Sequence, residues 1–119
     1  MTTSTLLLLI FSVAMGVVGQ LLLKRGMMDN PLMELEVRAV VKAILQPAVL
    51  LGFVCYGLAA ISWLVVLSRA PLSVAYPMLS LGYAAVAVLS WQLFGESMNA
   101  AKVVGIAAIL GGIVLLSRA

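Results

Sequence analysis

Four long apolar runs dominate this sequence and leave it few ways to fold. They extend over residues 5–23, 47–67, 72–94 and 101–116, and their lengths are close to the roughly 20 helical residues that cross about 30 Å of hydrocarbon. Because 65% of the 119 residues are hydrophobic and only 9% are charged, a water-soluble domain of this length could not bury its apolar surface. The sequence therefore predicts an all-α integral membrane protein, a bundle of four transmembrane helices.

The connections between these runs are short, with one exception. The first and second runs are joined by a longer segment whose apolar and charged residues predict a helix in the membrane interface over about residues 32–45. Within it, Glu34 precedes Arg38 by four residues, the spacing of a helical ion pair. Since nearly all of the chain is span or short connection, we expect a single transmembrane domain over residues 1–119.

Hydroxyl groups recur along the third run. Alternating spacings of three and four place the following residues on one face of a helix: Ser73, Tyr76, Ser80, Tyr83, Ala87 and Ser90. A hydroxyl in hydrocarbon costs free energy unless it has a partner, so we expect this face to point inward, toward other helices or a polar passage. The alternative is that small and hydroxylated residues only let helices pack closely. Pro77 removes one backbone hydrogen bond and predicts a bend.

A second polar stripe follows the first run, where Ser12, Gly16, Gln20 and Lys24 are spaced by four. Two interpretations stay open for Gln20: a hydrogen bond to a neighbouring helix, or a contact with a substrate or ion. Lys24 is either an anchor at headgroup level or a contact for a phosphate. On the second run, Trp63 is either an interfacial residue or a ring on which a ligand stacks.

Several kinds of chemistry lack the residues that they need. Histidine is absent and Cys55 is alone, so we expect no metal site. The four acidic residues lie in connections or at helix ends, and neither a nucleophile-elbow motif nor a phosphate-binding loop occurs. We therefore expect no catalysis, no direct use of ATP and no cofactor. The net charge of +3 is placed at helix ends, which suits lipid headgroups and not nucleic acid.

The remaining functional groups are aromatic rings, hydroxyls, one amide, and cations near both headgroup levels. They suit an anionic headgroup with hydrogen-bonding substituents, such as a phosphate joined to a sugar. The candidate substrate-binding residues are Gln20, Lys24, Trp63, Arg69, Tyr76, Ser80 and Tyr83. Among these, Lys24 and Arg69 would meet the phosphate at the two membrane surfaces.

Three segments resemble a known family: Gly16–Lys24 (GVVGQLLLK), Ala70–Gly82 (APLSVAYPMLSLG) and Gly105–Leu115 (GIAAILGGIVL). They are similar to four-helix members of the drug/metabolite transporter superfamily, and most of all to the small EamA-type subunits that flip aminoarabinose-phosphoundecaprenol across the bacterial inner membrane. The Val-Ala-Tyr-Pro-Met-Leu-Ser run is the most specific part. The resemblance implies four helices, a multi-pass location in that membrane, a lipid substrate, dimeric assembly and no soluble cofactor.

A sister group, the small multidrug resistance proteins, shares the Gly-to-Lys pattern of the first helix. Those proteins place an essential glutamate three residues before its glycine, and aligning that glycine with Gly19 puts Gly16 at the position of the acid. This departure favours a flippase for a polyprenyl-phosphate-linked sugar. The alternative is an exporter of small organic cations or metabolites. A third possibility is a subunit that does not transport but stabilises a partner.

The fourth run has a face of small residues at spacings of four, three and four: Ala101, Gly105, Ala108 and Gly112. Such spacing lets two helices approach closely. We therefore expect a homodimer, or a heterodimer with a similar small subunit, that forms through the fourth helix.

Positive charge is distributed unequally between the two sides of the bundle. The first and third connections contain five Lys and Arg residues, and the second connection with the termini contains two. This bias favours an orientation with both termini outside the cytoplasm, with insertion in both directions as the alternative.

Overall fold

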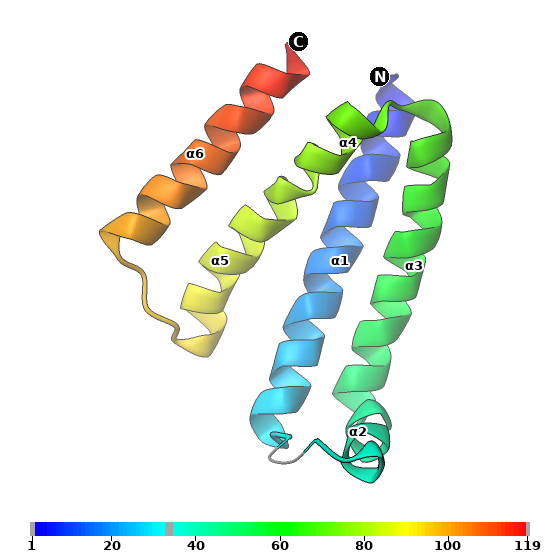
Figure 1. Cartoon of the computed structure of the whole chain (residues 1–119), viewed down its shortest axis with the longest axis vertical. Coiled ribbons are helices and arrows are strands. Elements are labelled where there is room, and N and C mark those ends of the chain that lie inside the picture. Colours follow the sequence, from blue (N-terminus) through cyan, green and yellow to red (C-terminus); the bar gives the residue numbers. More distant parts are fainter. Residues whose placement is uncertain (1, 33–34, 119) are drawn as a thin grey trace.

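The computed structural model describes residues 2–32 and 35–118, and every regular element in this part of the chain is a helix (Figure 1). The helices are α1 (Thr3–Asp29), α2 (Val37–Ile44), α3 (Pro47–Arg69), α4 (Leu72–Met78), α5 (Ser80–Phe94) and α6 (Ala100–Ser117). Four segments are long and apolar enough to cross a membrane, with α4 and α5 together forming the third. This confirms the predicted all-α fold with four spanning helices.

Side chains at the helix ends explain where two of the spans begin. The Thr2 hydroxyl accepts a hydrogen bond from the Thr5 backbone N–H at 3.3 Å and caps α1. The Asn99 side-chain oxygen accepts from the Lys102 backbone N–H at 2.9 Å and caps α6. At the other end, α1 continues to Asp29, beyond the predicted limit at residue 23, because Lys24 and Arg25 are good helix formers and do not interrupt a helix.

The interfacial helix is shorter than predicted. It covers Val37–Ile44 instead of residues 32–45, and the preceding Glu36 is extended, with φ −115° and ψ 146°. The helix packs against α3 and buries Ala43. Glu34 lies outside the described residues, so the predicted pair between Glu34 and Arg38 remains a prediction.

The third span is divided at Leu79, two residues after Pro77. The Leu79 N–H donates to the Tyr76 carbonyl at 3.0 Å, and the Gly82 N–H donates to the Leu79 carbonyl at 2.9 Å. Both bonds join residues three apart, which tightens the helix and changes its phase relative to an unbroken α-helix. The predicted inward-facing stripe is therefore not continuous along this span: Tyr83, Ala87 and Ser90 line the cavity described below, and Ser73, Tyr76 and Ser80 do not. The expected bend is present.

The helices pack unevenly. α1 and α3 form the most extensive contact, α5 packs against α1, and α6 packs against α5 and α4. Figure 1 shows α6 standing apart from α1 and α3, and both described ends of the chain lie at one end of the bundle. A small apolar cluster of Leu9, Val66, Ala70 and Ala75 joins α1, α3 and α4 at this same end. The bundle is thus a close helix pair with a looser second half.

Candidate functional site

A cavity of about 770 Å³ lies between the α1–α3 pair and the α5–α6 half, and all four spans contribute to its wall. This volume is within the usual range for small-molecule sites. Most of the wall is apolar, and its hydrogen-bonding or charged side chains are Ser12, Gln20, Tyr56, Trp63, Tyr83, Ser90, Glu96 and Lys102. The cavity can therefore hold a ligand that has a few polar groups within a largely apolar setting.

Gln20 on α1 and Tyr56 on α3 form a polar pair in the wall of the cavity. The Gln20 amide nitrogen donates to the Tyr56 hydroxyl oxygen at 2.6 Å. This bond confirms the interhelical interpretation of Gln20. It leaves both side chains with further hydrogen-bonding capacity. The Tyr56 hydroxyl still has its own proton to donate and the Gln20 carbonyl oxygen can accept, so the pair offers one donor and one acceptor to a ligand.

Two glycines allow the close contact that supports this pair. A Cβ added at Gly19 would lie 2.9 Å from the Gly52 carbonyl oxygen and 3.2 Å from the Tyr56 ring. Larger residues would push the backbones apart, so Gly19 also makes room for the ring. Nearer the termini, the buried Ser12 hydroxyl donates to the Ala59 carbonyl at 2.8 Å. Two contacts therefore hold α1 against α3 in this wall: the close backbone approach at Gly19 and the hydrogen bond from Ser12.

The opposite wall is built around α5. Its buried Gly82 lies against α1, since a Cβ added there would lie 3.3 Å from a methyl group of Val13. The adjacent Tyr83 lines the cavity with 63% of its surface exposed, and Leu79 at the bend lines it as well. A hydroxyl in this exposed position can meet a ligand, because no residue of the described chain forms a hydrogen bond with it.

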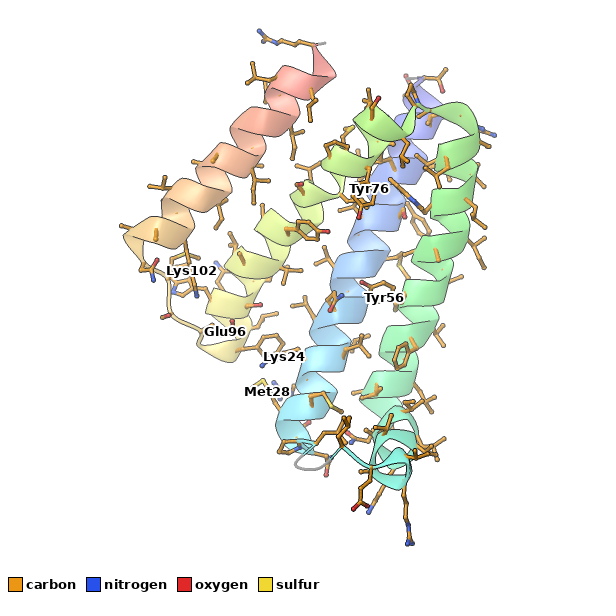
Figure 2. All side chains as sticks on the ribbon, viewed as in Figure 1. Lys24, Met28, Tyr56, Tyr76, Glu96 and Lys102 are labelled. Atoms are coloured by element: carbon orange, nitrogen blue, oxygen red, sulfur yellow. The ribbon has the colours of Figure 1, made fainter. Side chains whose placement is uncertain are left out.

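The connection between α5 and α6 brings charge to one end of the cavity. Gly95 ends α5 in the left-handed conformation, with φ 68°, which glycine adopts without a steric penalty. Glu96 follows directly, and Lys102 lies in the first turns of α6 (Figure 2). The Lys102 ammonium donates to the Ser97 carbonyl at 2.6 Å, which ties α6 to this connection.

Three of the seven predicted substrate-binding residues line the cavity: Gln20, Trp63 and Tyr83. The other four, which do not line it, are Lys24, Arg69, Tyr76 and Ser80. Tyr76 is 58% exposed and precedes the bend, where the change in helix phase separates it from Tyr83. Lys24 and Arg69 are exposed, Lys24 in the last two turns of α1 and Arg69 at the end of α3, and their contact with a phosphate remains a prediction.

Five polar residues of the cavity wall are not among the predicted substrate-binding residues: Ser12, Tyr56, Ser90, Glu96 and Lys102. The sequence pattern does place Ser90 on the inward face of the third run and Ser12 on the polar stripe of the first. A signal existed for Tyr56, which shares one side of its helix with Gly52 and Trp63. For Glu96 no periodic signal exists, because its position depends on the turn at Gly95 and on where α6 begins.

Comparison with known proteins supports the resemblance predicted from the sequence. The chain is 46% identical over 66 residues to the probable 4-amino-4-deoxy-L-arabinose-phosphoundecaprenol flippase subunit ArnE of Escherichia fergusonii, a match that covers 56% of this chain and 60% of the relative. It is 38% identical over 69 residues to the proteins of the same name from Salmonella paratyphi B and Salmonella typhimurium, covering 58% of this chain and 62% of each relative.

The chain thus spans about three fifths of the length of the curated relatives that it matches. No protein-family model matches it, and no solved structure does. The similarity to bacterial flippase subunits, together with four helices able to span a membrane, confirms the expected location as a multi-pass protein of the bacterial inner membrane. The chain is therefore similar to membrane flippase subunits.

Proposed function

We propose that this chain is a membrane transporter subunit that flips a polyprenyl-phosphate-linked sugar, or a related anionic lipid, across the bilayer. The observation that carries the proposal is the open cavity, to whose wall all four spans contribute and which combines apolar side chains with a few hydrogen-bonding groups. The names of the relatives point to the same chemistry, a sugar joined through a phosphate to undecaprenol. The polar headgroup would pass through the cavity while the polyprenyl tail stays in lipid.

We propose roles for the predicted substrate-binding residues on this basis. Gln20 and Tyr83 would form hydrogen bonds with the sugar, and Trp63 would stack on it. Tyr76 and Ser80, which lie outside the cavity wall, would contact the headgroup as it enters or leaves. Lys24 and Arg69 would meet the phosphate at the two membrane surfaces, so that the phosphate has a cationic partner on each side of the bilayer.

Transport rather than catalysis is the activity that we infer, carried out by one transmembrane domain over residues 1–119 without a cofactor. Among the described residues, no three metal-binding side chains converge. The described wall of the cavity contains one carboxylate, that of Glu96, which belongs to the connection between α5 and α6. A passage of this composition can bind and release a headgroup through hydrogen bonds and charge alone.

We also propose that the chain pairs with a second copy or a similar small subunit through α6. Only Ile113 of this helix is buried, and large apolar residues such as Val104 and Leu115 are 67% and 73% exposed. A Cβ added at Gly112, which does not line the cavity, would meet nothing within 4 Å. Space at this small residue supports the predicted close approach of another helix.

The experiment that tests the function is headgroup translocation in proteoliposomes that contain the chain, alone and with its partner. A polyprenyl-phosphate-linked sugar is placed in both leaflets. A membrane-impermeant reagent that reacts with the sugar headgroup then reports how fast headgroups from the inner leaflet reach the outer one. We expect Tyr83→Phe and Lys24→Ala each to slow translocation about five-fold, the effect of one lost hydrogen bond, and Ser62→Ala to match wild type, since its hydroxyl bonds only to the Leu58 carbonyl of its own helix. Full activity in both variants would remove the site assignment.

The alternative function, export of small organic cations, predicts a different result. Proton-coupled export needs an acid that exchanges a proton for the substrate within the membrane, and Gly16 stands where the related exporters have their glutamate. If this chain is a flippase and not such an exporter, addition of tetraphenylphosphonium to the detergent-solubilised protein should release no protons. Proton release would favour the exporter, whereas transport by the purified chain alone would reject a purely stabilising subunit.

A further inference from the structure

α2 presents three faces, and the rest of the described chain covers one of them. The covered face packs against α3 and includes the buried Ala43. A second face is apolar and exposed. It is formed by Val37, Val41 and the cap residue Leu45, which are 83%, 49% and 63% exposed and whose spacing of four places them in one apolar stripe. Within the described residues this apolar stripe is left uncovered.

The third face of α2 is basic. Arg38 and Lys42 are one turn apart and both are exposed, and at about 100° per residue they lie beside the apolar stripe. The ion pair that the described chain contains joins Arg25 to Asp29 and involves neither of them. Glu36 stands before the helix, where the helix dipole favours negative charge. α2 thus offers positive charge and apolar side chains to its surroundings side by side.

The fold holds α2 at the level of the lipid headgroups. Only Leu45 and Gln46 separate it from α3, a span that begins at Pro47, and Figure 1 shows it at the end of the bundle opposite the two described chain ends. The Asn30 side-chain nitrogen donates to the Gln46 side-chain oxygen at 3.3 Å, which joins this connection to the end of α1. The two spans therefore keep α2 at the membrane surface.

We propose that the exposed faces of α2 form a docking surface for acidic phospholipids of the bilayer. The apolar stripe inserts among the acyl chains, which any lipid supplies. Arg38 and Lys42 bind the phosphates and select lipids with a net negative charge, because each cation near an anionic leaflet favours it about five-fold. None of these residues lines the cavity. The surface thus acts on the lipid of the bilayer itself, whatever headgroup the cavity accepts.

Quenching by brominated lipids tests this inference on the full chain in lipid nanodiscs. A bimane fluorophore is attached at Val41→Cys in a Cys55→Ala background, so that the reporter lies on the apolar stripe. Brominated phosphatidylglycerol or brominated phosphatidylcholine is added at equal mole fraction to unbrominated phosphatidylcholine. We expect the acidic lipid to associate at least about five-fold more strongly than the zwitterionic one.

Substitutions assign this preference to the basic face. Arg38→Gln combined with Lys42→Gln should reduce the ratio of the two association constants to about one. Arg38→Lys combined with Lys42→Arg keeps both charges and should keep the preference. Arg118→Gln, at an exposed cation that ends α6, is the remote control and should behave as the reporter chain does.

Salt provides a measurement that needs no change in the basic face. At about 1 M salt, where the Debye length is about 3 Å, the preference of the reporter chain should disappear. Equal quenching by the two lipids at low salt, or a preference that survives the loss of both cations, would overturn the inference. Absence of quenching by either lipid would also overturn it, because protein and not lipid would then cover the apolar stripe. Headgroup translocation is a separate measurement, so either failure leaves the proposed function standing.

Discussion

The two halves of the bundle differ in how they are held together. α1 and α3 meet at Gly19 and Gly52, where the two backbones lie so close that neither position has room for a side chain. A buried hydrogen bond from Ser12 joins the same two helices at a second point. α6 contributes a single buried residue, Ile113, and lies against α5 and α4. The cavity lies between these halves, so one wall is fixed and the other is weakly held.

This difference follows from the physics of packing within a bilayer. Lipid tails are as apolar as leucine, so a helix gains little by leaving lipid unless small residues or hydrogen bonds allow close contact. α1 and α3 have both features. On α6, the space beside Gly112 is unfilled, and this is where the proposed partner helix would pack. Gly105 on α6 lines the cavity.

The largest expected effect on the fixed half comes from Gly52→Leu. A Cβ at this position would lie 3.0 Å from the Gly19 carbonyl oxygen and 3.0 Å from the Leu23 side chain, and the backbone oxygen cannot move aside. We expect the free energy of unfolding to fall by about 3 kcal/mol, measured by denaturation in detergent. Gly57→Leu on the same helix is the control, because a Cβ there meets nothing within 4 Å. Equal stability of the two variants would contradict the close contact.

A smaller effect is expected from Ser12→Ala. This substitution removes the buried bond to the Ala59 carbonyl and should cost about 1 kcal/mol, in line with hydrogen bonds between membrane helices. Ser62→Ala is the matched control, since its hydroxyl bonds within its own helix at 3.0 Å. The same unfolding assay checks both variants, and a Ser62 variant as destabilised as the Ser12 variant would show that the interhelical bond has no special weight.

The smallest effect on the fold is expected in the loose half. Gly112→Leu on α6 should leave the unfolding free energy of the isolated chain within about 0.5 kcal/mol of wild type, as surface substitutions usually do. The same change should reduce pairing with a partner at least several-fold, because a bulky side chain prevents close helix approach. Cross-linking in native membranes checks the pairing. Loss of stability without loss of pairing would show that α6 packs inside its own chain instead.

Sequence reasoning predicted the parts of this molecule that depend on local pattern. The four spans follow from uninterrupted apolar runs, the bend in the third span follows from Pro77, and the interhelical bond of Gln20 was one of its two interpretations. Each of these features is set by a property of the residue itself or of its immediate neighbours.

The remaining parts depend on geometry between elements. Tyr76 and Tyr83 are seven residues apart, which predicts one face, but the tightened turn at Leu79 places only Tyr83 in the cavity wall. Glu96 was assigned to a turn, and its place beside the cavity depends on Gly95 and on the position of α6. A periodic pattern contains no information about where a connection points a side chain.

The most direct test of the account is to fill the cavity without disturbing the fold. Gly16 lines the cavity, and a Cβ added there meets nothing within 4 Å, so Gly16→Phe would place a ring in the proposed path of the headgroup. The control is Gly57→Phe, at an exposed glycine outside the cavity wall. We predict that Gly16→Phe folds normally and loses headgroup translocation in proteoliposomes by about ten-fold or more, while Gly57→Phe transports as wild type. Translocation at the wild-type rate in folded Gly16→Phe would contradict a passage through this cavity.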